Sequence, residues 1–467
     1  MLYDKTPQYP HFAHLPFAKE PFKAIYVFQR IITTVLLVPI WILANLPRSR
    51  RPRQSWSLRQ IIFVNFTRRI YRVTEVAGVT WGTRNPEEEP GPRELKETVF
   101  EWAPPLKESL RKGVVLDRFG RVPFKRAGCF KQIPVIGIFF HGGGYSQLSA
   151  HEKSRTSHIP RRLMKNNLFT EIYAVEYRLL QHAPLPAVIM DAAAAYSHVV
   201  DKYYGSDFAS LTDKPARKPC KIILLGDSSG GNLALALARW IRDEQVLPTP
   251  DGLLLFSPSC DASHAFPSTD SSYIPRPHAS TDYLTDTPEP RALMQRTFLG
   301  FKYRPGGTGW GQWKRGRSRE GEIEEETRSL MEIIHSEYVS PASPRVLRRW
   351  GHIVDLYDGR FCVYFTLRDT FTPRNPAHSY PSRYPQFHTL FAQFPKTFIL
   401  IGDAERLTTE VGNLARAMGK DWGSVQVRWI PDAVHDVFMI PPGWWDERIK
   451  SEVWEDVKVW MRGFHEQ

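Results

Sequence analysis

The sequence predicts an α/β fold: a mostly parallel, doubly wound sheet with helices on both faces and a helical cap. Strand-like apolar runs recur along the chain at 134–140, 221–225, 398–402 and 425–430. The first two runs lead directly into the glycine-rich motifs HGGGY (141–145) and GDSSGG (226–231). Strands that alternate with helices in one chain are typical of parallel sheets, and a length of 467 residues with 42% hydrophobic residues suffices for a large core.

The second motif places Ser228 at the centre of a G-x-S-x-G, with the helix-like stretch 232–241 after it. This arrangement predicts a sharp strand-to-helix turn that exposes the serine hydroxyl. Glycines two positions to either side allow strand and helix to approach closely, and the helix N-terminus favours developing negative charge. We therefore predict that Ser228 is a nucleophile.

The HGGG motif supplies the complementary part of such a site. Glycines leave backbone N–H groups uncovered, so that they can point at a tetrahedral oxyanion. We expect the amides of Gly142 and Gly143 to be donors, with that of Ser229 as the third. Neither G-K-[S/T] nor G-x-G-x-x-G follows the motif, which argues against a phosphate-binding loop.

With these two motifs the chain resembles the hormone-sensitive-lipase-like branch of the α/β-hydrolase fold, a group of esterases and lipases with HGGG and GDSAGG motifs. The resemblance spans about residues 130 to 465. Residues 175–191 are similar to the family's DYRLAPEHPFPAAL-D stretch, and Ser257-Pro258 with Asp261 is similar to its S-P-x-x-D. It implies a serine-hydrolase triad that runs serine, acid, histidine along the chain.

Two acids compete for the acid position of the triad after the strand-like run 398–402. The family pattern is similar to G-x-x-D-x-L-x-D-E, and its anchors place Glu405 at the catalytic position, with Asp403 as the alternative. Glutamate orients a histidine as well as aspartate does. His435 follows the last strand-like run and matches the family's HGF loop, although Asp436 replaces the glycine.

This chemistry requires no metal and no organic cofactor. The four cysteines, Cys129, Cys220, Cys260 and Cys362, are scattered without C-x-x-C, so neither a zinc site nor a disulfide framework is indicated.

The N-terminal segment is basic and apolar. The net charge is +13, and nine basic residues against two acidic ones lie within residues 1 to 60. The charge is not accompanied by a nucleic-acid-binding motif. Residues 24–46 are long and apolar enough for a membrane anchor, and Arg48, Arg50, Arg51 and Arg53 follow.

The anchor leaves alternatives open. Pro39 and Arg30 within the segment make a shallow insertion into the membrane nearly as plausible as a full span. A buried helix of a large cap would have the same length and apolar composition. A secretory signal is disfavoured because the basic cluster follows the apolar run. We expect residues 24–53 to bind the endoplasmic reticulum or another internal membrane, with the catalytic domain in the cytosol.

The expected organisation is an N-terminal anchor and basic flank (1–60) and a catalytic domain (61–467), with cap helices and insertions near 282–335 and 343–385. An amphipathic helix over 56–76 belongs to this cap or lies on the membrane. The oligomeric state is not indicated.

We predict a serine carboxylic-ester hydrolase that acts on a lipophilic small-molecule ester, such as a sterol, terpenoid or acylglycerol ester, through an acyl-serine intermediate. An acyl-transfer or cyclising enzyme of specialised metabolism would use the same residues. A non-catalytic receptor is disfavoured because receptors related to this family lack the histidine, whereas His435 is present.

Overall fold

The computed structural model describes residues 20–77, 96–104, 114–119, 133–205 (without 181, 182 and 184), 218–266, 276–284, 328–352 and 389–465 (without 422), and single positions 17, 294, 297, 298 and 354. Much of the two predicted insertions, namely residues 285–293, 299–327 and 355–385, therefore lies outside the described residues, as do Cys129 and Cys362.

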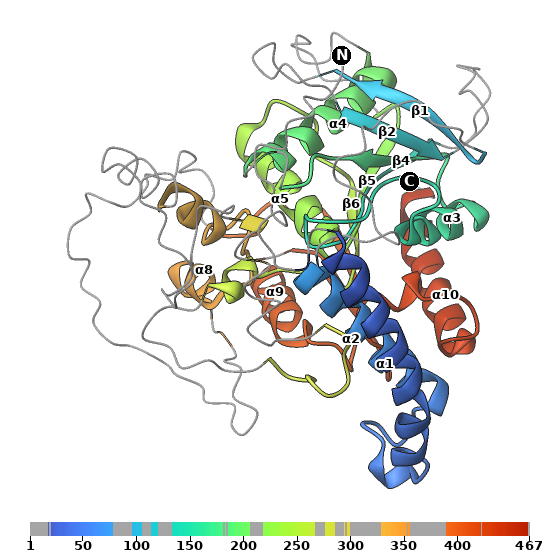
Figure 1. The fold of residues 1–467 in the computed structure, drawn as a ribbon. Coiled ribbons are helices and arrows are strands. Elements are labelled where there is room, and N and C mark those ends of the chain that lie inside the picture. The colour runs from blue at the N-terminus through green and yellow to red at the C-terminus, as the bar shows by residue number, and fades with distance from the viewer. Residues whose placement is uncertain are drawn as a thin grey trace, which may run out of the picture.

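Eight strands form one sheet in the described part of the chain (Figure 1). They are β1 (Thr98–Ala103), β2 (Val114–Phe119), β3 (Val135–Phe140), β4 (Glu171–Glu176), β5 (Lys221–Asp227), β6 (Gly252–Phe256), β7 (Lys396–Gly402) and β8 (Val425–Ile430). The strand order is β1-β2-β4-β3-β5-β6-β7-β8. Strand β2 pairs antiparallel with β1 and β4, and every other neighbouring pair is parallel. The predicted α/β-hydrolase fold is confirmed.

Helices cover both faces of the sheet. The helices of the described residues are α1 (Phe22–Ala44), α2 (Leu58–Ala77), α3 (His158–Lys165), α4 (Ala187–Tyr204), α5 (Ser229–Glu244), α8 (Pro344–Arg349), α9 (Thr408–Lys420) and α10 (Glu447–His465), with the short 3-10 turns η1 (Arg48–Arg50), η2 (Arg155–Ser157), η4 (Ala262–Ala265) and η6 (Val437–Met439). One apolar cluster joins α4, α5, α8 and α9 to the sheet, and a second joins α3 and α10 to it.

Burial follows from the sequence of the central strands. Every residue of β3, β4, β5 and β6 is buried, because both faces of these strands are covered by helices. The apolar runs 134–140 and 221–225, which predicted β3 and β5, are continuous for this reason.

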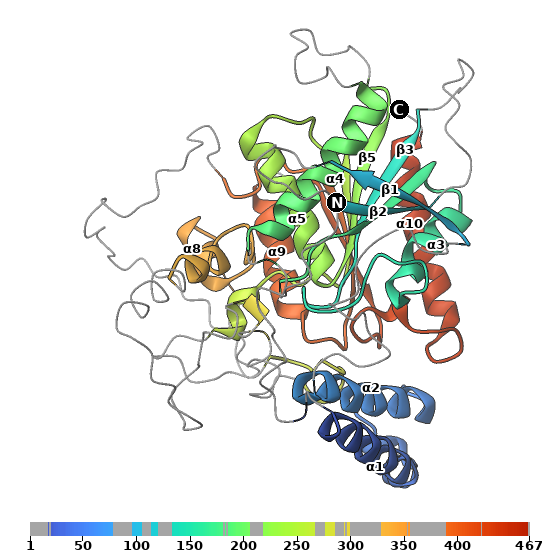
Figure 2. The same ribbon diagram turned by 45° about the horizontal axis from the view of Figure 1, so that its top comes forward.

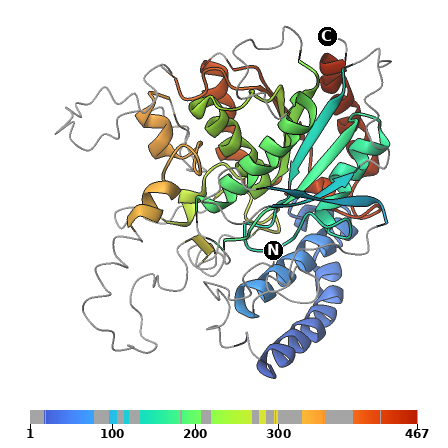
Figure 3. The ribbon, with the colours of Figure 1, turned by 90° about the horizontal axis from the view of Figure 1, so that it is seen from above.

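The N-terminal helices project as a pair from one end of the molecule (Figure 2). Residues Phe22–Ala44 form α1 and Leu58–Ala77 form α2, as the apolar and amphipathic patterns predict. Figure 3 shows α2 between α1 and the rest of the chain. The expected domain boundary at residue 60 falls in the first turn of α2.

Candidate active site

The strand-to-helix turn holds Ser228 in a strained conformation. Its φ is 51° and its ψ is −119°, directly between β5 and α5. A Cβ on Gly226 would lie 2.3 Å from the carbonyl oxygen of Gly230, and one on Gly230 would lie 2.0 Å from that of Phe140. Only glycine fits at either position, so the turn brings the Ser228 hydroxyl to the carboxyl-terminal edge of the sheet.

Three predicted side chains meet at this edge from three different loops. The Nε2 atom of His435 lies 3.0 Å from Oγ of Ser228, and its Nδ1 atom lies 2.8 Å from Oε2 of Glu405. The side chains of His435 and Glu405 are almost fully buried. This is the geometry by which an imidazole takes a proton from a serine while a carboxylate orients the ring.

Asp403, the alternative acid, lies away from the imidazole. Its Oδ1 atom accepts a hydrogen bond from the amide of Asp432 at 2.8 Å and lies 2.9 Å from the guanidinium of Arg53. The geometry therefore favours Glu405 over Asp403 as the partner of His435.

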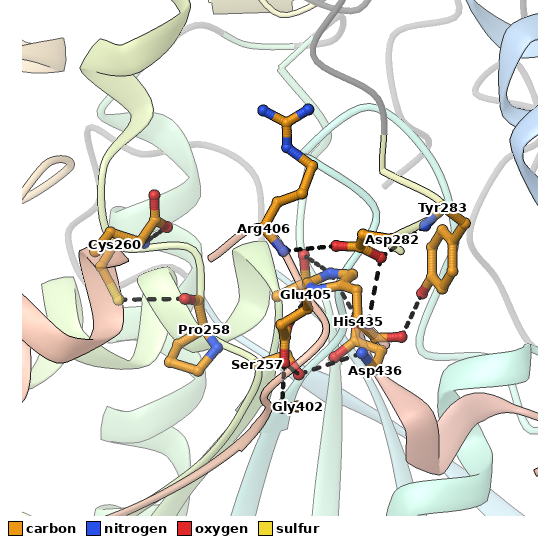
Figure 4. A network of polar contacts seen from close by, with 12 residues as sticks. Ser257, Pro258, Cys260, Asp282, Tyr283, Gly402, Glu405, Arg406, His435 and Asp436 are labelled. Atoms are coloured by element: carbon orange, nitrogen blue, oxygen red, sulfur yellow. Dashed lines mark hydrogen bonds and ion pairs between the residues drawn. The ribbon is translucent and has the colours of Figure 1, made fainter. Parts of the chain in front are cut away.

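A second tier of contacts holds the acid and the histidine (Figure 4). The hydroxyl of Ser257 donates to Oε1 of Glu405 at 2.8 Å, and the hydroxyl of Tyr283 donates to the carbonyl of His435 at 2.7 Å. Asp282 accepts hydrogen bonds from the amides of Tyr283 and Arg406. The Ser257 and Asp282 segments thus fix the loops that carry the two triad members.

The glycine loop lies against the serine turn. The ring of His141 stacks on Tyr177 at 4.3 Å, and the hydroxyl of Tyr177 donates to the carbonyl of His141 at 2.5 Å, which fits the expectation that His141 orients its own loop. The amide of Tyr145 donates to Oγ of Ser229 at 3.4 Å and ties the loop to the first turn of α5.

The three expected oxyanion donors differ in orientation. Among the described residues, no protein atom accepts from the amides of Gly143 or Ser229. The amide of Gly142 is instead directed toward the buried carboxylate of Asp227, without reaching hydrogen-bond geometry. Gly143 and Ser229 are therefore better placed than Gly142 to stabilise an oxyanion.

Neighbouring carboxylates shift the pKa of His435. Burial disfavours the imidazolium, but the carboxylates of Asp436 and Glu405 together raise the pKa of His435 well above its ordinary value. Burial raises the pKa of Glu405, while its hydrogen bond to His435 opposes that rise.

The contribution of Asp436 is the feature that the sequence reasoning missed. Its Oδ2 atom lies 3.0 Å from Nε2 of His435, on the side that faces the nucleophile. The sequence feature that could have indicated this contact is the acidic residue directly after the histidine, where the hormone-sensitive-lipase-like branch has glycine.

Two further segments of the resemblance organise the scaffold. The guanidinium of Arg178 donates to both carboxylate oxygens of Asp191, with Nη2 to Oδ1 at 2.6 Å and Nε to Oδ2 at 2.9 Å. Glu410, at the end of the acid motif, accepts from the amide of Cys260 and lies 2.8 Å from Arg276. Burial raises the pKa of Glu410 to about 7, with Arg276 opposing the rise.

Part of the chain is similar in sequence to known proteins. Residues 137–300 match a family model described as alpha/beta hydrolase fold. Carboxylesterase NlhH of Mycobacterium tuberculosis is 31% identical over 138 residues, which is 29% of this chain and 38% of that protein. Probable carboxylesterase 8 of Arabidopsis thaliana is 32% identical over 128 residues, 27% of this chain and 38% of that protein.

A human relative and a solved structure extend the comparison. Arylacetamide deacetylase-like 2 of Homo sapiens is 32% identical over 107 residues, 23% of this chain and 24% of that protein. Brefeldin A esterase, titled a bacterial homologue of human hormone sensitive lipase, superposes with a TM-score of 0.48 and 16% identity over 78% of this chain and 76% of its own. The matched region thus spans less than half of the length of the three curated relatives named here. The chain has the α/β-hydrolase fold, and its HGGG and GDSSGG motifs are similar to those of the hormone-sensitive-lipase-like branch.

Proposed function

We propose that the protein is a serine carboxylic-ester hydrolase. The observation that carries this proposal is the contact series from Oγ of Ser228 to Nε2 of His435 at 3.0 Å and from Nδ1 of His435 to Glu405 at 2.8 Å. Ser228 attacks the ester carbonyl as His435 takes its proton, and the amides of Gly143 and Ser229 stabilise the oxyanion. His435 then protonates the leaving alcohol, and water attacks the acyl-serine by the same sequence.

A lipophilic ester is the substrate class that the surroundings favour. The ring of Tyr283 lies 6.0 Å from that of His435, stacks on Tyr71 of α2 at 5.4 Å and meets Phe63 edge-on at 6.5 Å. Tyr145, whose amide bonds the Ser229 hydroxyl, meets Phe298 at 6.0 Å. Aromatic side chains close to the triad suit an apolar acyl or alcohol group.

A p-nitrophenyl ester series of rising acyl length tests the proposal. We expect wild-type protein to release p-nitrophenol with a preference for the longer chains, and the Ser228→Ala variant to fall to the uncatalysed rate. Equal rates for the two proteins would overturn the assignment. Adding an alcohol acceptor separates hydrolysis from acyl transfer, since transfer yields a new ester without equivalent free acid.

We further propose that α1 attaches the protein to a membrane. Its most apolar stretch has a mean hydropathy of 1.9 and is 6% buried. The large apolar side chains that α1 leaves exposed are Phe22, Ile25, Phe28, Ile31, Ile32, Val35, Leu36, Ile40 and Leu43. A lipid surface is the occupant that fits a face of this length, and the exposed Arg48 and Arg50 beside it suit anionic headgroups.

The geometry favours attachment in the plane of the membrane over a span. Thr33 and Thr34, near the midpoint of α1, accept hydrogen bonds from the guanidinium of Arg69 on α2. The neighbouring Arg68 of α2 donates to the carbonyl of Asp282 beside the active site at 2.6 Å. An upright α1 would carry these arginines into the hydrocarbon, which is costly, whereas a helix lying in the interface leaves them on the protein side.

Two of the four arginines expected at the headgroups bind the protein instead. Arg51 donates to the carbonyl oxygens of Asn45 and Trp56, and Arg53 pairs with Asp403. Because the chain turns back toward the sheet directly after α1, these two guanidinium groups contact protein atoms instead of lipid headgroups.

Vesicle flotation tests the attachment. With vesicles of phosphatidylserine and phosphatidylcholine, we expect wild-type protein to float and the Val35→Glu/Leu36→Glu double variant to stay in the dense fraction. Val459→Glu on α10 is the matched control, because Val459 is 60% exposed and Val35 is 65% exposed. Protein that resists alkaline carbonate extraction from cell membranes would contradict the in-plane geometry.

The orientation toward the cytosol remains part of this proposal. Asn65-Phe66-Thr67 is an N-x-T sequon for N-glycosylation. It is a poor reporter of topology, because Thr67 is buried in α2 with 8% exposure. Sequons appended at each terminus report it without that difficulty. We expect neither to be glycosylated, and glycosylation of the C-terminal one would place the catalytic domain in the lumen.

A further inference from the structure

The imidazole of His435 has a carboxylate at each ring nitrogen. Glu405 lies at Nδ1, and Asp436 lies at Nε2 with a separation of 3.0 Å. The hydroxyl of Ser228 lies at the same nitrogen and at the same distance. Nε2 has one hydrogen or one lone pair to offer, so Ser228 and Asp436 compete for it.

Backbone conformation places this second carboxylate. Asp436 has φ 47° and ψ 47°, the left-handed region in which aspartate is among the few residues tolerated besides glycine. Its amide donates to Oγ of Ser257 at 3.2 Å, and that hydroxyl also donates to Glu405. A single serine therefore holds both carboxylate-bearing loops against the imidazole.

The charges around the pair are mostly negative and buried. Asp436 is 2% exposed. The other titratable groups that face His435 or Asp436 are Asp227 at the end of β5, Asp282 and Tyr283 from the segment 276–284, Glu405 after β7, Glu410 of α9 and Tyr71 of α2. Arg68 of α2 and Arg406 after β7 lie against Asp282. Burial raises the pKa of Asp436, and His435 opposes the rise. A proton held jointly by Asp436 and His435 relieves the repulsion among these carboxylates.

We propose that Asp436 is a positioning residue for the proposed esterase reaction, which shares the Nε2 proton of His435 and withholds the general base until that proton leaves. While the proton bridges Nε2 and Oδ2, Nε2 has no lone pair for the Ser228 hydroxyl. When the proton passes to solvent, Nε2 accepts the Ser228 proton during attack. The ionised Asp436 then stabilises the imidazolium that forms, as Glu405 does at Nδ1.

Asp436 should therefore have opposite effects on the reaction rate at low and at high pH. At low pH the shared proton suppresses attack, and at high pH the more basic imidazole accelerates it. A purely structural contribution of Asp436 would lower the rate by a constant factor at all pH values.

The pH dependence of kcat/KM for a p-nitrophenyl ester tests the inference in wild type, Asp436→Gly and Asp436→Asn. Glycine suits the left-handed backbone, and asparagine keeps the shape without the charge. In both variants we expect the acid limb to move to lower pH by about one unit or more. We also expect kcat/KM at the alkaline plateau to fall by about threefold to tenfold. Asp432→Asn, which removes a half-buried charge earlier in the same loop, is the control and should leave the limb in place.

A titration of His435 by NMR of ¹⁵N-histidine-labelled protein gives a readout without substrate. His435 should titrate at lower pH in Asp436→Gly than in wild type, by a shift that matches the kinetic limb. Unchanged titration in a folded variant overturns the inference whether or not the protein hydrolyses esters. Absence of esterase activity in wild type, with the titration shifted as expected, would instead count against the proposed function alone.

Discussion

Arg53 and Asp403 form an ion pair, with Nη1 of the arginine 2.9 Å from Oδ1 of the aspartate, that joins the N-terminal segment to the loop after β7. The same guanidinium donates to the backbone carbonyl of Asp403 at 2.6 Å. Glu405, two residues further along, belongs to the contact series around His435. One short loop therefore carries an acid that binds the N-terminal segment and an acid that contacts the imidazole.

Because the two acids have different partners, their substitution should affect the kinetics differently. Glu405→Gln should lower kcat by about 10²- to 10⁴-fold, because the amide favours the wrong imidazole tautomer. Asp403→Asn should lower it by less than about threefold, since Asp403 contacts Arg53 and not His435. Steady-state kinetics of the two variants checks this, and a severe Asp403→Asn with a mild Glu405→Gln would reverse the assignment.

Covalent labelling distinguishes the two adjacent serines. A fluorophosphonate probe should label wild type and Ser229→Ala but not Ser228→Ala, because Oγ of Ser228 lies 3.0 Å from Nε2 of His435 whereas Oγ of Ser229 accepts from the Tyr145 amide. Mass spectrometry of the labelled peptide locates the adduct. Label retained in Ser228→Ala and lost in Ser229→Ala would move the nucleophile by one position.

The glycines of the turn predict a steep effect on stability. Gly230→Ala should destabilise the fold by more than about 3 kcal/mol, because the new Cβ would lie 2.0 Å from the carbonyl oxygen of Phe140. Gly412→Ala in α9 is the matched control, since nothing lies within 4 Å of its Cβ. It should be neutral or stabilise by up to about 1 kcal/mol, as alanine favours helices over glycine. Urea denaturation of both proteins measures the difference.

A buried carboxylate predicts an acid-sensitive contact at the sheet edge. Burial of Glu152 opposes ionisation, but hydrogen bonds from the amides of Lys96, Glu97 and Thr98 and from the Thr98 hydroxyl lower its pKa to about 2. A lowered pKa stabilises the fold above the unfolded value of about 4.3 and loses that contribution as pH falls toward 2.

Glu152→Gln should therefore destabilise the protein at neutral pH by roughly 1–3 kcal/mol, because the amide satisfies fewer of these donors. Thermal unfolding at neutral pH and at about pH 3 checks the expectation, with the difference between the two proteins shrinking at the lower pH. A difference that stays constant with pH would show that charge on Glu152 contributes nothing.

Local sequence patterns determined the strands, the turn at Ser228 and the order of the candidate triad. The apolar runs predicted β3, β5 and β7 because both faces of those strands are covered, and they also predicted β8, which lies at the edge of the sheet and is only partly buried. The glycines around Ser228 predicted the turn because a Cβ there would collide with backbone. The apolar stretch 24–46 likewise predicted a long helix, found as Phe22–Ala44, since length and composition need no partner.

Contacts between distant segments were decided by the tertiary structure alone. The sequence places Asp403 two residues from Glu405, but only the packing of the N-terminal segment supplies Arg53 to one and the loop after β8 supplies His435 to the other. The direction of the Gly142 amide depends on Asp227, 85 positions later. The contact of Asp436 with Nε2 of His435 depends on a left-handed φ, which an aspartate residue tolerates but does not require. A linear pattern records which groups are present, whereas the distances between loops, and hence the charges each group feels, exist only once the sheet has brought the loops together.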